Sequence, residues 1–317
     1  MDLLITGSVA FDYLMTFPGK FRDHILLEKI EAISLSFLVD SLVRRRGGIA
    51  PNIAYTYALL GGKPQIFATV GEDFEEYRAW LEQMGIDTTW AKVISNEHTA
   101  SFFATTDQEN AQLASFYPGA MAHAGELSLR DLKEKPDLAV ISPNKPQAMN
   151  KYLDECKELG IPYAYDPSQQ VVRVEGDVLS YGIQGALALF LNEYELELVM
   201  KKTGMNQKQI LQHVKFMVVT LGDKGATVFT TEEECHVNAV KPERIIDPTG
   251  AGDAFRGGFL IGYSHGWNWN TCAQMGALTA TYCLESDGPQ GHNYSRREYV
   301  NRYRQHYDDH GLLDVLI

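Results

Sequence analysis

Residues 247–259 read Asp-Pro-Thr-Gly-Ala-Gly-Asp-Ala-Phe-Arg-Gly-Gly-Phe, and they carry more information about the fold than any other stretch. A proline and two glycines, Gly250 and Gly252, form a turn that runs into a long helical pattern. Such a turn leaves backbone N–H groups unpaired at the start of a helix, where they and the helix dipole stabilise an anion. Asp253 lies at the same place. A carboxylate there is useful if it accepts a proton from an attacking hydroxyl, although a simple helix cap predicts the same residue.

A second glycine turn stands nearer the start of the chain. Gly47 and Gly48 precede the helical pattern Ile49-Ala-Pro-Asn-Ile-Ala54. Because this turn also enters a helix, its N–H groups are available to a ligand in the same way. The two turns together suggest two ligand sites.

Around these turns, short apolar runs alternate with helical patterns. The runs predict strands at residues 3–5, 65–70, 138–142, 163–166, 186–191, 216–221 and 226–230. The other patterns predict helices at residues 51–60, 74–84, 146–159, 193–203 and 207–213, within 252–285, and at 296–310. This alternation indicates a doubly wound α/β body, in which helices connect the parallel strands of one sheet.

Two segments break this rhythm. Residues from about 12–37 and 95–117 show strand-like alternation without a long helix, and they predict a small separate sheet. No internal repeat and no Pro- or Ser-rich linker divides the chain, so we expect a single domain over residues 1–317. Three basic residues, Arg44-Arg45-Arg46, are interpreted as the solvated end of a helix, with a phosphate contact as the alternative.

The composition excludes several classes of protein. The chain has 317 residues, of which 45% are hydrophobic and 22% charged, as in ordinary globular proteins. Its 28 Lys and Arg against 41 Asp and Glu give a net charge of −13, which repels nucleic acid. No apolar run reaches the ~18 residues of a membrane span. The four cysteines form no CxxC pair, which is typical of reduced thiols in the cytoplasm.

The two glycine turns carry a family resemblance. Residues 47–71 and 247–260 resemble the two signature motifs of the ribokinase-like carbohydrate kinases, the PfkB family, and match them throughout. The resemblance implies a mostly parallel, doubly wound sheet with helices on both faces and a small β-sheet lid. It also implies a kinase that uses ATP and Mg²⁺, and many members of the family require K⁺ as well.

The resemblance implies a role for each matching residue. Asp253 would be the general base on the acceptor hydroxyl. The anion hole would be formed by the N–H groups of Gly250, Ala251, Gly252 and Asp253. Substrate hydroxyls would be bound by Asp12, Gly48 and Asn52. For Asp12, a turn residue at the end of a strand is the alternative.

Other matches concern the nucleotide and the metal. Asn192 and Glu195 resemble the family's Asn-x-x-Glu motif, which organises Mg²⁺ and phosphates through water, although helix caps use the same residues. Thr220, Gly222 and Gly225 resemble the loop beside the nucleotide, and by themselves they predict an ordinary hairpin turn.

One departure from the family lies after Asp166-Pro167. Many relatives have Asn and Arg there, whereas this chain has Ser168 and Gln169. A phosphate contact commonly made by those residues is therefore in doubt.

The acceptor is a small molecule whose class depends on a closer resemblance. Residues 48–52 and 117–123 look like the prokaryotic adenosine or broad nucleoside kinases of the family. The aromatic residues near the expected lid would cover a nucleobase, or would pack the lid or a dimer interface: Phe11, Phe17, Phe102, Phe103, Phe116 and Tyr117. We therefore expect a nucleoside acceptor, phosphorylated at its 5′-hydroxyl by a monomer or homodimer. A sugar kinase and a non-catalytic nucleotide-binding regulator are the alternatives.

Overall fold

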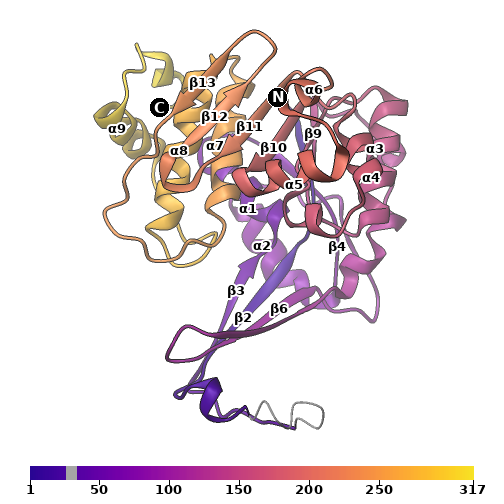
Figure 1. The fold of residues 1–317 in the computed structure, drawn as a ribbon, viewed down its shortest axis with the longest axis vertical. Coiled ribbons are helices and arrows are strands. Elements are labelled where there is room, and N and C mark those ends of the chain that lie inside the picture. The colour runs from indigo at the N-terminus through magenta and orange to yellow at the C-terminus, as the bar shows by residue number, and fades with distance from the viewer. Residues whose placement is uncertain (26–33) are drawn as a thin grey trace.

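The computed structural model describes residues 1–25 and 34–317, and a nine-stranded sheet forms its centre (Figure 1). The strands lie in the order β13 (Glu234–Val237), β12 (Ala226–Phe229), β11 (Phe216–Thr220), β10 (Ala188–Asn192), β9 (Tyr163–Tyr165), β8 (Leu138–Ile141), β1 (Leu3–Thr6), β4 (Pro64–Val70) and β5 (Ala91–Val93). All neighbouring pairs are parallel except β11–β12 and β12–β13. The predicted doubly wound α/β fold is thus confirmed.

Helices cover both faces of this sheet because alternate strand residues point to opposite sides. Leu3 and Ile5 of β1 pack into one apolar cluster, and Leu4 between them packs into another. The first cluster includes residues of α1 (Ile49–Leu59), α2 (Glu75–Gln83), α7 (Ala251–Ser264), α8 (Trp269–Leu284) and α9 (Arg296–His306). The second includes residues of α3 (Pro146–Leu159), α4 (Gly176–Ile183), α5 (Glu193–Thr203) and α6 (Gln207–Leu211).

A second sheet of four strands projects from one end of the body (Figure 1). Its order is β3 (Ser41–Gly47), β2 (Ala10–Thr16), β6 (Ala100–Thr106) and β7 (Gln112–Tyr117). Strands β2 and β6 are parallel, and the outer pairs are antiparallel. We call this small sheet the lid. Within the range expected at 12–37, β2 ends at Thr16, and residues 26–33 lie outside the described part of the chain.

Three sequence predictions need correction. Arg44–Arg46 do not end a helix, because they belong to β3, which pairs with β2 over its whole length. The last helix ends at His306 rather than at 310, since Tyr307 is already extended. The helix predicted over 207–213 ends at Leu211. The short strands β5 and β13 had no distinct signal in the sequence.

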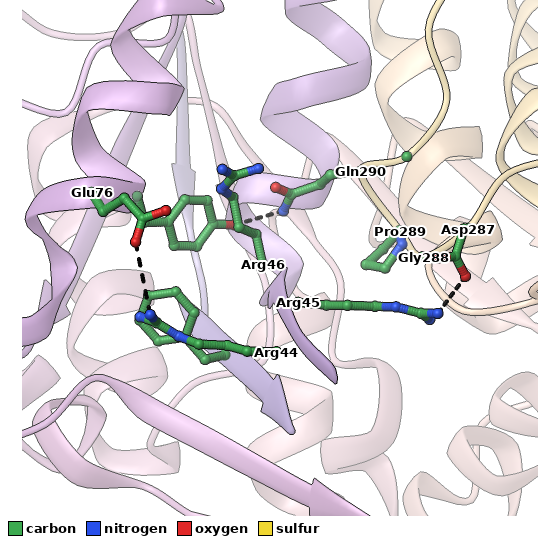
Figure 2. A pocket seen from close by; sticks show the side chains of 11 residues that line it. Arg44, Arg45, Arg46, Glu76, Asp287, Gly288, Pro289 and Gln290 are labelled. Carbon is green, nitrogen blue, oxygen red and sulfur yellow. Dashed lines mark hydrogen bonds and ion pairs between the residues drawn. The ribbon is translucent and has the colours of Figure 1, made fainter. Parts of the chain in front are cut away.

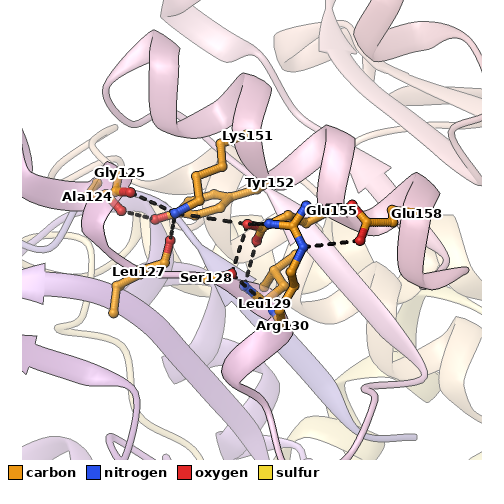
Figure 3. Close-up of polar contacts among 10 residues, drawn as sticks. All are labelled: Ala124, Gly125, Leu127, Ser128, Leu129, Arg130, Lys151, Tyr152, Glu155 and Glu158. Atoms are coloured by element: carbon orange, nitrogen blue, oxygen red, sulfur yellow. Dashed lines mark hydrogen bonds and ion pairs between the residues drawn. The ribbon is translucent and has the colours of Figure 1, made fainter.

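One buried carboxylate fixes the segment that precedes β8 against α3 (Figure 3). Glu155 of α3 is 1% exposed, and it accepts hydrogen bonds from Ser128 Oγ at 2.9 Å, Leu129 N at 2.6 Å and Arg130 Nη1 at 2.6 Å. Arg130 also pairs with Glu158, one turn further along the helix. Glu155 therefore satisfies a buried backbone N–H, and it shares the partly exposed guanidinium of Arg130 with Glu158.

We expect Glu155→Ala to lower the free energy of unfolding by about 1–3 kcal/mol, because it leaves the buried N–H of Leu129 without its acceptor. Glu158→Ala is the matched control, and since that side chain is 57% exposed its loss should cost much less than the loss of Glu155. Thermal and denaturant unfolding of both variants checks this. Equal losses in the two variants would contradict the role given to Glu155.

Candidate active site

A cavity of about 1490 Å³ lies between the lid and the body. Its walls come from the inner face of the lid, from the turns before α1 and α7, and from residues at or just beyond the carboxyl ends of the parallel strands β8 to β11. Open α/β sheets bind their ligands at this end. The predicted site residues that line it are Asp12, Gly48, Asn52, Asn192, Glu195, Thr220, Gly250, Ala251, Gly252 and Asp253. Gly222 and Gly225 are outside it.

The turn before α7 has the form of an anion site. Gly250 caps the helix with φ of 78°, and an added Cβ would meet Pro289 Cβ at 2.4 Å, so only glycine fits there. Thr249 N donates to Asp247 Oδ1 at 2.9 Å, which closes the turn. The N–H groups of Gly252 and Asp253 find no acceptor among the residues that the structure describes. They are available to a negatively charged ligand in the cavity.

Asp253 is held by a chain of hydrogen bonds that starts at the base of the lid. Asn52 Nδ2 donates to Asp253 Oδ2 at 2.9 Å, and Gln290 Nε2 donates to Asn52 Oδ1 at 2.7 Å. The same Gln290 nitrogen lies 2.6 Å from the hydroxyl of Tyr77, which donates to the carbonyl of Gly47 at 3.0 Å. Gly47 is the last residue of lid strand β3. The carboxylate is thus oriented by groups from both glycine turns.

The environment of Asp253 changes its acidity. Burial raises its pKa to about 6, and the nearby Arg256 guanidinium and the hydrogen bond from Asn52 oppose this rise. Asp166 and Glu195 raise it further. A carboxyl group with a pKa near 6 is ionised at neutral pH, yet it is a stronger base than an exposed aspartate.

Asp12 lies on the inner face of the lid, directly across the strand pair from Arg45. Burial raises the pKa of Asp12 to about 6, and Arg45 opposes the shift. Arg45 itself binds Asp247 Oδ2 at 2.7 Å and also bonds to Asp287 (Figure 2). A lid strand is thereby connected to the turn that precedes α7.

The other two arginines of β3 point to the opposite face of the lid and line a smaller cavity of about 290 Å³ (Figure 2). Arg44 lies 3.8 Å from the centre of the Phe11 ring, and Arg46 lies 4.5 Å from that of Trp80. These contacts explain why a run of three arginines is stable in a strand. Arg45 pairs with acidic partners on one face, and Arg44 and Arg46 lie over aromatic rings on the other, where Arg44 also pairs with Glu76 at 3.8 Å.

Asn192 and Glu195 form a capping box at the start of α5. Asn192 Oδ1 accepts from Glu195 N, and Glu195 Oε2 accepts from Asn192 N, both at 2.8 Å. Burial raises the pKa of Glu195. The described residues contain no cluster of three or more metal-ligating side chains. Mg²⁺ commonly takes one or two carboxylates together with water and substrate phosphates, so a single carboxylate at the cavity wall fits a hydrated Mg²⁺.

The remaining predicted residues separate into two groups. Thr220 ends β11 at the cavity, whereas Gly222 and Gly225 lie in the turn between β11 and β12. Of the six aromatic residues, only Phe102 and Phe116 line the cavity, as cross-strand neighbours in the lid. The others lie elsewhere: Phe11, Phe17, Phe103 and Tyr117.

The sequence analysis missed one residue deep in the site. Arg256 follows Asp253 by one helical turn, lines the cavity and donates to Asp166 Oδ1 at 2.7 Å. Its side chain is 11% exposed and that of Asp166 is fully buried. Arg256 stands inside the most informative motif of the sequence, but its partner is 90 residues away, and no local pattern connects them.

Comparisons with known proteins agree with one another. The family model described as "pfkB family carbohydrate kinase" matches residues 10–295. A nucleoside kinase of Methanocaldococcus jannaschii is 27% identical over 302 residues, with 95% of this chain and 96% of that protein covered. The structure of the Burkholderia thailandensis nucleoside kinase in complex with inosine is 35% identical and has a TM-score of 0.86, covering 96% of this chain and 98% of that one. The same kinase in complex with ADP-inosine is 36% identical and has a TM-score of 0.84, covering 96% of each chain.

The pKa of Asp253 predicts a pH-dependent stability. Since folding raises this pKa from 3.8 to about 6, ionising the carboxyl group costs free energy in the folded state. The full cost is present above about pH 6 and vanishes below about pH 4. We expect Asp253→Asn to increase the free energy of unfolding by about 1–3 kcal/mol at pH 8 and to leave it nearly unchanged at pH 3.5. Denaturant unfolding at both pH values checks this, and a less stable variant at pH 8 would contradict it.

Proposed function

This chain belongs to the pfkB family of carbohydrate kinases, and on that premise we propose that it transfers the γ-phosphoryl group of ATP to the 5′-hydroxyl of a ribonucleoside. The enzyme is a phosphotransferase with an alcohol acceptor. The observation that carries the proposal is the position of Asp253, a largely buried carboxylate in the cavity beneath the lid. It stands at a helix start where the N–H groups of Gly252 and Asp253 have no acceptor in the described part of the chain.

The proposed reaction uses this arrangement directly. Asp253 accepts the proton of the acceptor hydroxyl while the oxygen of that hydroxyl forms a bond to the γ-phosphorus of ATP. The bond from that phosphorus to the β-γ bridging oxygen breaks, and ADP leaves. The N–H groups of Gly252 and Asp253, with that of Gly250, would stabilise the negative charge on the phosphoryl oxygens. Ala251 N donates to the carbonyl of Pro248 at 3.4 Å, so it would have to exchange this weak bond to join them. The products are ADP, the nucleoside 5′-phosphate and the proton on Asp253.

The acceptor assignment is supported from two sides. Two of the similar solved structures are of a nucleoside kinase, one in complex with inosine and one with ADP-inosine. In this chain, Asp12, Asn52 and Gly48 line the cavity. Asp12 would accept hydrogen bonds from the 2′- and 3′-hydroxyls of a ribose, and Asn52 and Gly48 would contact the same ring. Phe102 and Phe116 provide an apolar surface for the base on the same face of the lid. A free sugar offers nothing to cover this surface, so the sugar-kinase alternative is less favoured.

Asn192, Glu195 and Thr220 would lie on the nucleotide side of the cavity. Glu195 would hold a hydrated Mg²⁺, which supplies charge neutralisation to the phosphates when bound. Gly222 and Gly225 would let the backbone of the β11–β12 turn approach the nucleotide. A K⁺ requirement, a monomeric or homodimeric state and a cytoplasmic location stay predictions. No helix in the described parts of the chain is long and apolar enough to cross a membrane.

The first kinetic test concerns Asp253 as the general base. We expect Asp253→Asn to lower kcat by roughly 10²–10⁴-fold while the affinities for ATP and the nucleoside stay close to those of the wild type. In the wild type, kcat/KM should fall as the pH drops through about 6, where Asp253 takes up a proton. A coupled assay of ADP release between pH 5 and 9 measures both. Near-normal turnover by the folded variant would refute this assignment.

The second test concerns the ribose. Removing one hydroxyl would leave the half-buried carboxylate of Asp12 partly unpaired, at a cost of about 1–3 kcal/mol. We therefore expect 2′- or 3′-deoxynucleosides to have kcat/KM values about ten-fold or more below those of ribonucleosides. Asp12→Ala should abolish most of this difference. If the variant discriminates as strongly as the wild type, Asp12 does not contact the ribose.

A panel of acceptors separates the candidate functions. Efficient phosphorylation of ribose or fructose, with no nucleoside accepted, would show that the protein is a sugar kinase and not a nucleoside kinase. No ADP release, with or without any acceptor, would favour the non-catalytic regulator.

A further inference from the structure

Arg256 is a buried cation at the centre of the site that the proposed reaction has not used. Its Nη2 donates to Asp166 Oδ1 at 2.7 Å, and Asp166 Oδ2 accepts from Ser142 Oγ at 3.2 Å. The guanidinium is therefore held by the carboxylate of Asp166, which is fully buried and is itself positioned by the hydroxyl of Ser142. This support fixes the direction of the side chain toward the cavity that it lines.

The guanidinium lies against the anion-binding turn. A Cβ added to Gly252 would stand 3.0 Å from Arg256 Nη1, so the space beside that glycine is taken by the charged group. The same Nη1 is 3.7 Å from Asp253 Oδ1, slightly beyond hydrogen-bond distance. An anion held by the N–H groups of Gly252 and Asp253 is thus within reach of Arg256.

The acidic side chains around the cavity are partly compensated by the positive charge of Arg256. Three acidic side chains face the same region, Asp253, Asp166 and Glu195, and all three interact with Arg256. Without a positive charge, these carboxylates would repel the phosphates of a nucleotide. Arg256 compensates for one of them through its ion pair with Asp166 and leaves Nη1 directed at the turn.

The other cations on the cavity wall are less suited to this task. Among the described residues that line it, these are Arg45 and Arg173. Arg45 already bonds to Asp247 and Asp287, and the side chain of Arg173 is exposed. Ser168 and Gln169, which follow Asp166, also line the cavity but bring no charge. Arg256 is thus the buried positive group nearest to the turn.

We propose that Arg256 is a catalytic residue, whose Nη1 donates a hydrogen bond to an oxygen of the phosphoryl group during its transfer. Asp166 is its positioning residue. Arg256 stays protonated throughout, while the proton of the acceptor goes to Asp253 and the bridging-oxygen electrons leave with ADP. A guanidinium stabilises the charge on the equatorial oxygens best in the transition state, so its effect falls on kcat more than on ground-state binding. This inference rests on the proposed kinase function.

Two simpler roles make different predictions. If Arg256 only lowered the pKa of Asp253, its loss would shift the pH profile to higher pH, and turnover would recover fully in alkaline buffer. If it only supported the fold, its loss would reduce stability and would affect every ligand equally.

The test compares Arg256→Gln, Arg256→Lys and Asp166→Asn with the wild type. Calorimetry gives the affinity for ADP·Mg²⁺ alone and for ADP·Mg²⁺ with aluminium fluoride and inosine, which mimics the phosphoryl group in transit. We expect Arg256→Gln to weaken binding of the aluminium fluoride complex by about 100-fold and to lower kcat by a similar factor. Binding of ADP alone should change by less than about five-fold. Arg256→Lys should recover only part of the loss, since lysine cannot contact both Asp166 and the phosphoryl group. For Asp166→Asn, kcat and the affinity for the aluminium fluoride complex should lie between those of the wild type and of Arg256→Gln.

Arg304→Gln is the matched control. Arg304 of α9 pairs with Asp309 at 2.8 Å and with Asp314 at 2.6 Å. None of these residues lines the cavity, so this variant loses two ion pairs without touching the site. It should bind the aluminium fluoride complex as the wild type does, and thermal unfolding of all variants shows whether each is folded.

Several outcomes overturn the inference. One is an equal loss of affinity for ADP and for the aluminium fluoride complex in Arg256→Gln. Another is full recovery of kcat at pH 9 in the same variant. A wild type that releases no ADP with any nucleoside or sugar overturns the proposed function instead. An active wild type with an equally active Arg256→Gln overturns only the role of Arg256.

Discussion

The structure depends on keeping one largely buried carboxylate charged in the cavity beneath the lid. Asp253 stands at the start of α7, where burial raises its pKa to about 6 and therefore favours its neutral form. The helix start, the amide of Asn52 and the guanidinium of Arg256 offset this cost without neutralising the group. The glycines of the turn follow from the same constraint, since Gly250 needs a left-handed conformation and Gly252 leaves room for Arg256. An active site that stores such an unfavourable charge gains a base at the expense of stability.

The lid is connected to this carboxylate by two routes. One passes through side chains, from the carbonyl of Gly47 through Tyr77 and Gln290 to Asn52. The other is the ion pair of Arg45 with Asp247, which joins strand β3 to the turn before α7. Strand β3 also carries Arg45, the cross-strand neighbour of Asp12. The residues proposed to bind the acceptor and those proposed to bind the phosphoryl group are therefore connected through the same strand, which sets their relative positions.

The body of the fold could be predicted from the sequence, because its strands and helices are determined by local patterns. The helices at 146–159 and 193–203 have the predicted bounds. The two glycine turns were also found, since each is a local signal. Long-range interactions were not visible: β3 looked like a helix end because its pairing with β2 and its aromatic partners are distant in sequence. Arg256 was overlooked for the same reason, as its role depends on Asp166, which only the fold brings beside it.

The most direct test is to follow the phosphorus atom. The enzyme is incubated with ATP, Mg²⁺ and equal concentrations of a ribonucleoside, such as inosine, and ribose, and the products are identified by ³¹P nuclear magnetic resonance. The account predicts a single new phosphate ester coupled to the two 5′-methylene protons of the nucleoside, with an equal amount of ADP. A phosphate ester on ribose, an ester at the 2′- or 3′-oxygen, or ADP formed without any ester would contradict it.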